Sequence, residues 1–208
     1  MLLKKYEKVS VSLVGARGYV GQELMKILVD HPVFELKYVF SREHSGKKVC
    51  EVYSDVASEL SFTETTIEKV CEIDTQIIIL ALPNGFAEDY FNALLPARES
   101  CVFIDMSSDY RVDDSWVYGL PEKNQKKLVH AKRISNPGCY ATAVQLCLLP
   151  LIGKIVGIPA FFGISGYSGA GTKKSNKNNP EIIKDNILSY GMRSHTHERE
   201  VNYQNDLE

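Results

Sequence analysis

The chain has 208 residues, enough for one medium-sized domain or for one domain and part of a second. Its hydrophobic share of 44% is typical of a globular protein, and its net charge of −2 argues against a general nucleic-acid binder, which would be basic. No apolar run reaches the roughly 18 residues of a membrane span, and the N-terminus lacks a secretory signal. Five cysteines without CxxC spacing favour neither a zinc site nor a disulfide framework, so we expect a cytoplasmic protein without metal, nucleic-acid or membrane partners.

Between residues 9 and 105, apolar runs with strand character alternate with segments of helical periodicity. The run 9–14 (Val-Ser-Val-Ser-Leu-Val) is rich in β-branched residues and ends at a glycine, which predicts a buried strand. The predicted elements are strands at 9–14, 34–40, 75–82 and 102–105 and helices at 21–30 and 87–95. Strands that alternate with helices indicate an α/β fold, with a parallel sheet of the Rossmann type covered on both faces.

A second unit is predicted to follow. A helix over 137–149 is entered through Asn136-Pro-Gly, segment 160–166 predicts a buried strand, and the polar stretch 173–179 predicts a loop. We therefore expect an NADP-binding Rossmann-type domain at 1–150, which includes the start of that helix, and the beginning of an α+β catalytic and dimerisation domain at 151–208. Too few residues follow the strand to build a usual sheet, so we expect this second domain to be incomplete and its strand edge to lack neighbours.

The loop after the first predicted strand is rich in glycine. Gly15-Ala-Arg-Gly18-Tyr-Val-Gly21 has GxxGxxG spacing rather than the commoner GxGxxG. Glycines permit a tight turn and a close backbone approach, and the helix that follows offers free N–H groups to a pyrophosphate. A glycine triplet alone is compatible with plain turn chemistry. Because this one joins the first strand to the first helix of an α/β chain, we predict that it binds a dinucleotide.

The end of the second predicted strand guides the choice of cofactor. An NAD enzyme usually has Asp or Glu there for the ribose 2′-hydroxyl. This chain has Ser41 and Arg42 instead, with no acid until Glu43. A hydroxyl and a guanidinium suit a 2′-phosphate, which predicts NADP(H). The alternative is a solvated surface arginine.

One cysteine is placed to act as a nucleophile. Cys139 follows Asn136-Pro-Gly and falls in the first turn of the predicted helix, whose positive end favours a thiolate. The other cysteines lack such a setting, and Cys147 is interpreted as a small core residue. His195 and His197 are the candidates for the accompanying acid and base, because an imidazole titrates near neutral pH.

These segments give the sequence a family resemblance. Asn136-Pro-Gly-Cys-Tyr-Ala-Thr resembles the active-site segment of N-acetyl-γ-glutamyl-phosphate reductases, the arginine-pathway relatives of aspartate-semialdehyde dehydrogenase. The glycine loop and five further segments follow in the family's order: 81–85, 107–111, 118–122, 166–171 and 190–197.

The resemblance implies a reaction and a set of residues. The reaction is NADPH-dependent reductive dephosphorylation of N-acetyl-γ-glutamyl phosphate, an acyl phosphate, to the semialdehyde through a cysteine thioester in a homo-oligomer. The implied catalytic residues are Cys139 and, by family position, His197. The implied cofactor contacts are Gly15, Arg17, Gly18, Tyr19, Val20, Gly21, Ser41, Arg42, Pro83 and Asn84. The implied substrate contacts are Ser107, Arg111, Asn136, Ser168, Gly169 and His195. For Ser107, Arg111 and the 168–171 turn, a helix cap or turn role is the alternative.

The sequence also departs from the family. Members commonly carry Pro-Glu after the second histidine, where this chain has Glu198-Arg199-Glu200, and they run on well past the histidine motif. The chain is therefore expected to be truncated at its C-terminal side. Two other functions stay open: another acyl-phosphate or semialdehyde dehydrogenase of the same superfamily, and a catalytically silent nucleotide-binding fragment. A Cys/His protease is a more distant third.

Overall fold

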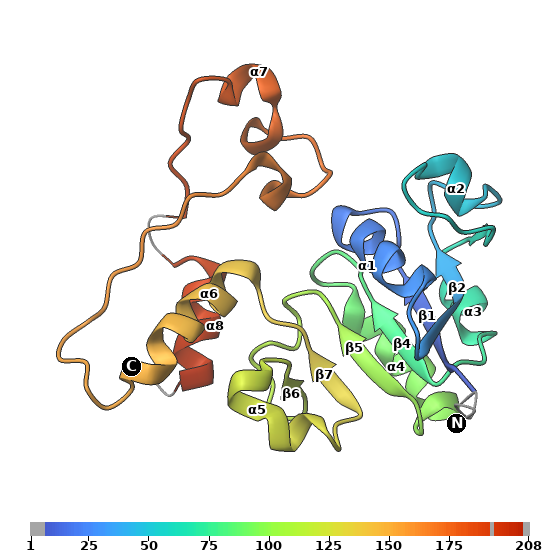
Figure 1. Ribbon diagram of the computed structural model, residues 1–208, viewed down its shortest axis with the longest axis horizontal. Coiled ribbons are helices and arrows are strands. Elements are labelled where there is room, and N and C mark those ends of the chain that lie inside the picture. Colours follow the sequence, from blue (N-terminus) through green and yellow to red (C-terminus); the bar gives the residue numbers. More distant parts are fainter. Residues whose placement is uncertain (1–6, 192–193, 206–208) are drawn as a thin grey trace, which may run out of the picture.

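In the computed structural model, which describes residues 7–191 and 194–205, a parallel sheet organises the first two thirds of the chain. The seven strands have the order β3-β2-β1-β4-β5-β7-β6, and every pairing is parallel (Figure 1). The strands are β1 (Val9–Val14), β2 (Phe34–Phe40), β3 (Phe62–Thr63), β4 (Ile77–Leu80), β5 (Val102–Asp105), β6 (Val117–Tyr118) and β7 (Arg133–Ser135). The Rossmann-type α/β prediction is confirmed.

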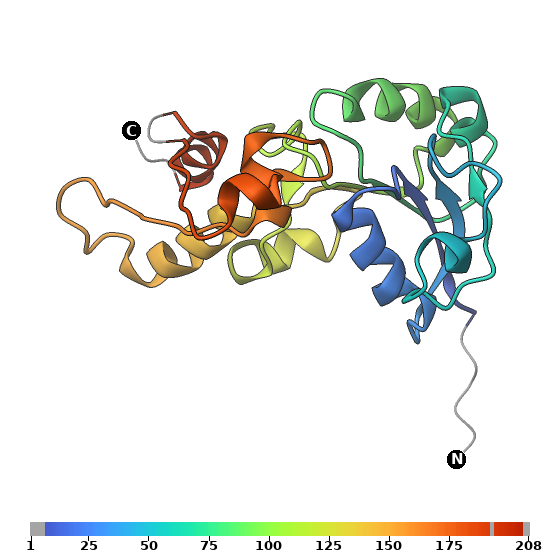
Figure 2. The same ribbon diagram turned by 90° about the horizontal axis from the view of Figure 1, so that it is seen from above.

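Helices cover both faces of this sheet. They are α1 (Tyr19–Val29), α2 (Val49–Val52), α3 (Ile67–Cys71), α4 (Ala87–Arg98) and α5 (Pro121–Leu128). Figure 2 shows α1 and α4 on opposite faces. Each face has its own apolar core: Met25 and Leu28 of α1 pack in one, and Phe91 and Leu94 of α4 pack in the other. A parallel sheet needs such cover because its strands are apolar on both sides.

The strand order reverses at β1, which pairs with both β2 and β4. In open α/β sheets, ligands bind at such a switch point, outside the carboxyl ends of the strands. The loops after β1 and β4 both begin at this edge. Because all strands are parallel, the segment after β7 begins at the same edge, and that segment leads to Cys139.

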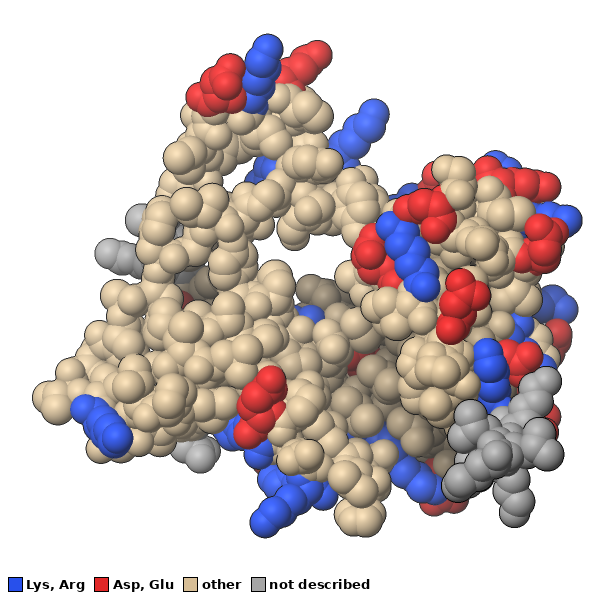
Figure 3. All heavy atoms as spheres, in the orientation of Figure 1, with Lys and Arg blue, Asp and Glu red and all other residues tan. Residues whose placement is uncertain are grey.

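Beyond the sheet, α6 (Cys139–Leu148) and α8 (Thr196–Asn205) pack side by side through a small core of Ala141, Leu148 and Val201. Between them the chain forms an extended arm with the 3₁₀ turns η1 (Leu149–Leu151), η2 (Tyr167–Ala170) and η3 (Asn176–Asn178) and the short helix α7 (Pro180–Ile183). Figure 3 shows an opening between this arm and the body, and charged side chains gather over the Rossmann-type half of that face.

The expected strand at 160–166 is wrong, because these residues have no strand pairing in the structure. A strand requires neighbours for its N–H and C=O groups. In the described part of the chain after β7 there is no other strand to supply them. The apolar side chains of this segment are instead largely exposed, with Phe162 and Ile164 at 89% and 75%.

The remaining boundaries differ modestly. The helix expected at 21–30 begins earlier, at Tyr19, because Gly18 is its N-cap. The helix expected at 87–95 continues to Arg98 through Pro96. Residues 192, 193 and 206–208 of the expected second domain lie outside the described residues. No helix in the described part of the chain is long and apolar enough to span a membrane.

Candidate active site

The glycine loop lies at the switch point and is packed against the loop after β4. Gly15 has a φ of +90°, and a Cβ there would lie 2.5 Å from the carbonyl oxygen of Ala81. A Cβ on Gly21 would lie 2.7 Å from the backbone of Ala16. A Cβ on Gly18, by contrast, would meet nothing within 4 Å. Two of the glycines are thus required by the fold, and the third leaves open space in front of α1.

The N-terminus of α1 is suited to an anion. Gly18 is its N-cap and supplies no side-chain hydrogen bond, and the first turn holds no acidic residue. Free N–H groups at the positive end of the helix therefore face the open space beside Gly18. A cradle of this kind fits the pyrophosphate of a dinucleotide. Tyr19 and Val20 begin the helix and are partly exposed, at 41% and 49%.

The residues predicted to read the 2′-phosphate differ in their partners. Ser41 is buried and its hydroxyl accepts a hydrogen bond from the His44 N–H, which stabilises the turn after β2. Arg17 forms an ion pair with Glu43, and this pairing lowers the pKa of Glu43. Arg42 is exposed and makes no ion pair with any described residue. Unlike the guanidinium of Arg17, that of Arg42 is therefore available to pair with the 2′-phosphate of NADP(H).

Cys139 is the first residue of α6 and its side chain is exposed. Gly138 precedes it as the N-cap, so no side chain occupies the end of the helix. The interpretation of Cys147 as a core residue is wrong, because its side chain is also exposed, in the last turn of the same helix. The two exposed thiols therefore lie at opposite ends of one helix dipole.

His197 reaches the backbone beside the cysteine from the first turn of α8. A Cβ on Gly138 would lie 2.5 Å from Nε2 of His197. The imidazole therefore packs directly against the residue that precedes Cys139. Burial lowers the pKa of His197, and the nearby charge of Glu200 opposes this shift. A lowered pKa favours the neutral imidazole, the form that can accept a proton at neutral pH.

Glu200, which was not predicted from the sequence, connects α8 to the turn before Cys139. Its side chain is only 3% exposed. It accepts hydrogen bonds from Tyr118 Oη at 2.6 Å and from the Gly138 N–H at 2.8 Å, and it pairs with Arg111 Nη1 at 3.3 Å. Burial and this hydrogen bond raise the pKa of Tyr118, which stays a donor. The available signal was spacing, because a residue three positions after His197 on a helix lies on nearly the same face.

Comparisons with known proteins identify the family of the chain. Residues 10–131 match the family model of the semialdehyde dehydrogenase NAD binding domain, and residues 139–207 match that of the semialdehyde dehydrogenase dimerisation domain. The chain belongs to the semialdehyde dehydrogenase family.

The curated relatives of the chain carry a more specific name. The chain is 45% identical over 195 residues to an N-acetyl-gamma-glutamyl-phosphate reductase of Xanthomonas campestris pv. campestris, covering 94% of this chain and 62% of that protein. It is 44% identical to the protein of that name from Xylella fastidiosa, covering 94% and 60%. The chain thus spans about three fifths of the length of these relatives.

Solved structures of aspartate semialdehyde dehydrogenases share the fold. The Candida albicans enzyme, solved with NADP, aligns with a TM-score of 0.61 at 19% identity over 88% of this chain and 56% of that one. The Vibrio cholerae enzyme aligns with a TM-score of 0.58 at 21% identity over 80% and 49%.

Some of the other residues predicted to contact cofactor or substrate form hydrogen bonds within the protein. The Ser107 hydroxyl donates to buried Asp105 at 2.8 Å, as a turn role requires. Asn84 is exposed, and its Oδ1 accepts from the Ser108 N–H at 3.1 Å, which ties the loop after β4 to the loop after β5. Pro83 next to it is exposed at the same sheet edge.

The other predicted substrate residues fall into two places. His195 accepts a hydrogen bond through Nδ1 from the His197 N–H at 3.1 Å, and the centroids of the two imidazole rings lie 4.8 Å apart. Asn136 lies in the turn that leads to Cys139, where its side chain donates to the Pro137 carbonyl. Ser168 and Gly169 lie on the exposed arm, in η2. Arg111 donates hydrogen bonds to Glu200 and to the backbone carbonyls of Met106 and Asn136.

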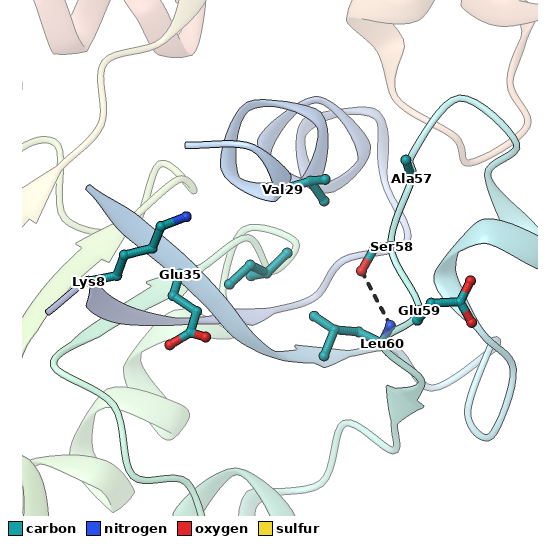
Figure 4. A pocket seen from close by; sticks show the side chains of 8 residues that line it. Lys8, Val29, Glu35, Ala57, Ser58, Glu59 and Leu60 are labelled. Atoms are coloured by element: carbon teal, nitrogen blue, oxygen red, sulfur yellow. Dashed lines mark hydrogen bonds between the residues drawn. The ribbon is translucent and has the colours of Figure 1, made fainter. Parts of the chain in front are cut away.

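A hollow of about 290 Å³ lies away from these residues (Figure 4). Its lining consists of Lys8, Val29, Glu35, Leu36, Ala57, Ser58, Glu59 and Leu60. None of the predicted site residues borders it. Among the described residues, no group of His, Cys, Asp or Glu is arranged to hold a metal ion.

Proposed function

We propose that this semialdehyde dehydrogenase is an N-acetyl-γ-glutamyl-phosphate reductase, which converts an acyl phosphate to the corresponding semialdehyde with NADPH. The observation that carries the proposal is the packing of His197 against Gly138, the residue before Cys139 at the start of α6, with the open glycine loop at the same edge of the sheet. The shared name of the curated relatives supports this substrate over aspartyl phosphate.

The residues supply the proton and carbon chemistry as follows. His197 takes the thiol proton of Cys139, and the thiolate attacks the acyl carbon. A carbon–sulfur bond forms, the carbon–oxygen bond to phosphate breaks, and protonated His197 gives its proton to the leaving phosphate. When bound, NADPH would supply a hydride to the thioester carbon. Collapse of the reduced adduct to the aldehyde then releases the Cys139 thiolate, and neutral His197 passes to it a proton taken up from solvent.

The N-terminus of α6 is also suited to the oxyanion of this reaction. Its first turn carries no acidic residue and no side-chain cap. Backbone N–H groups at the start of a helix stabilise developing negative charge. His195, beside His197, is proposed to orient the substrate, together with Asn136.

NADP(H) is the proposed cofactor, which would be held by the loop from Gly15 to Gly21, by Ser41 and Arg42, and by Pro83 and Asn84. Changing Arg42 to alanine is expected to weaken NADPH binding by one to two orders of magnitude, because a charge-assisted contact contributes about 1.5–3 kcal/mol. NADH affinity should hardly change. Fluorescence titration with both cofactors measures this, and Lys126→Ala serves as a control because it removes an exposed positive charge from α5, outside the proposed cofactor site. Equal losses for both cofactors in Arg42→Ala would assign Arg42 to the fold alone.

The substrate is tested by phosphate-dependent NADPH formation from N-acetylglutamate semialdehyde, with aspartate semialdehyde as the competing substrate. The assay is run on this chain and on a longer chain that spans the full length of the relatives. Turnover of the acetylated substrate supports the proposal, and preference for aspartate semialdehyde assigns the chain to the other branch. Cofactor binding without turnover by either chain would support the silent nucleotide-binding fragment.

Three broader expectations accompany this function. A homo-oligomer is proposed because residues 139–207 match a dimerisation domain. We keep the domain boundary near residue 150, although the two family matches change over between residues 131 and 139. A cytoplasmic location stays our prediction, since a catalytic thiol needs reducing conditions.

A further inference from the structure

The turn that leads to the nucleophile is held from both sides of Pro137. On one side, Arg111 Nε donates to the carbonyl oxygen of Asn136 at 2.9 Å. On the other, the Gly138 N–H donates to Glu200 Oε1 at 2.8 Å. Arg111 and Glu200 are themselves paired at 3.3 Å. This largely buried ion pair therefore holds the peptide units on both sides of Pro137, where the chain turns into α6.

The pair comes from two separate parts of the chain. Arg111 lies after β5, and its Nη2 also donates to the Met106 carbonyl oxygen at 3.1 Å. Glu200 lies on α8, where Gln204 Nε2 also donates to the Arg111 carbonyl oxygen at 2.7 Å. These contacts attach α8 to the Rossmann-type sheet at the point where Cys139 begins its helix.

A buried carboxylate is costly unless it is fully partnered, and Glu200 has donors on both oxygens. The tyrosine among them, Tyr118, is in turn held by Gln145 Nε2 of α6 at 2.6 Å. A carboxylate with so many partners has little freedom to move. Its position therefore fixes α8, and with it His197, relative to α6.

We propose that Glu200 is a positioning residue of the reductase reaction, which holds His197 against the Cys139 turn through the Gly138 N–H and Arg111. This proposal rests on the proposed function. Gly138 is enclosed by the groups in question, because a Cβ there would lie 2.5 Å from His197 Nε2 and 2.7 Å from Arg111 Nη1. Glu200 thus acts through other residues and needs no contact with the substrate.

The same carboxylate also affects the protonation of His197. The charged and titratable groups that face this imidazole are Glu200 on α8, His195 just before α8, and Arg111 in the loop after β5, and the Cys139 thiol follows the Gly138 contact by one residue. Glu200 is the group among them that raises the pKa of His197, whereas burial, His195 and Arg111 lower it. Loss of its charge should therefore move the titration of His197 to lower pH.

The test compares Glu200→Gln, Glu200→Asp and Glu198→Gln. The first removes the charge and keeps the shape, the second keeps the charge, and the third removes an exposed charge from the same helix. In Glu200→Gln we expect kcat to fall by on the order of 10²-fold, as for a catalytic group misplaced by about 1 Å, with a smaller change in KM. The acidic limb of the kcat profile should shift down by about one pH unit. Glu200→Asp should restore part of both, and Glu198→Gln should match the wild type.

A second measurement keeps the test independent of turnover. The ring protons of His197 are titrated by NMR in the same variants, and urea unfolding establishes that each variant is folded. A downward shift in Glu200→Gln but not in Glu198→Gln supports the positioning role even if no chain reduces the acetylated substrate, which would overturn the proposed function alone. An unchanged His197 titration together with an unchanged kcat and KM in a folded Glu200→Gln variant would overturn the positioning role.

Discussion

Replacement of Cys139 by serine is expected to lower turnover by roughly 10³-fold or more while NADPH affinity stays nearly unchanged. A serine hydroxyl keeps the size of the side chain but cannot form a thiolate, so no thioester is made. The nucleotide loop is a separate segment after β1, and it should bind the cofactor as before. Steady-state assays and cofactor titration on the same preparation measure both effects. Residual turnover near the wild-type level would remove Cys139 from the mechanism.

The chain provides its own control for the reactivity of this thiol. Cys139 and Cys147 are both exposed, on the first and last turns of α6. The helix dipole favours an anion at the first and disfavours it at the last, by about 0.3–1 kcal/mol at each end. We therefore expect brief iodoacetamide treatment to modify Cys139 about tenfold faster than Cys147, as mapped by mass spectrometry. Faster labelling of Cys147 or Cys50 would contradict this reading of the site.

Replacement of Gly15 by alanine is expected to lower the free energy of unfolding by about 2–4 kcal/mol, a large share of the total for a protein of this size. Two causes add at this position. The φ of +90° is unfavourable for a residue with a Cβ, and that Cβ would lie 2.5 Å from the backbone oxygen of Ala81. Backbone cannot rotate away as a side chain can, so β1 and β4 must separate locally.

A variant at Gly46 separates the cost of the positive φ from the cost of the steric contact. Its φ is +83°, but a Cβ there would meet nothing within 4 Å. Gly46→Ala should therefore lose only the conformational part, about 1–2 kcal/mol. Urea unfolding of both variants, with the slope checked for constancy, gives the comparison. Equal losses would mean that the contact with Ala81 relaxes without cost.

The sequence predicted the centre of the sheet well and its margins poorly. The strands at residues 9–14, 34–40 and 102–105 were predicted at their observed bounds, because each carries a run of β-branched or aromatic residues. The strands β3, β6 and β7, which have two or three residues each, were not predicted. So short a segment has no periodicity, and its pairing depends on neighbours that are distant in sequence. The strand expected at 160–166 failed for the opposite reason, since its composition is suitable but its neighbours are absent from the described chain.

The candidate site was predicted to a similar extent. Cys139 at the start of a helix followed from Asn136-Pro-Gly, since proline and glycine before an apolar run mark a helix entry. The placement of Glu200 did not follow, because its partners Arg111, Tyr118 and Gly138 are brought to it by tertiary packing. Arg111 was assigned to the substrate on its charge, and the structure gives its three nitrogens to protein acceptors. Local sequence identifies the chemical groups but not their final partners.

The contacts that hold the Pro137 turn also have a consequence for the order in which the chain folds during synthesis. The acceptor of the Gly138 N–H lies 62 residues further along the chain, and the partner of Arg111 lies 89 residues further. The strands from β1 to β7 are all made before α8. A growing chain can therefore assemble its nucleotide half on the ribosome while the nucleophile is still without its imidazole and its carboxylate anchor. We expect the contacts of His197 and Glu200 with the Pro137 turn to form only when α8 has emerged and docked, so a chain released before α8 should bind cofactor and carry out no reduction.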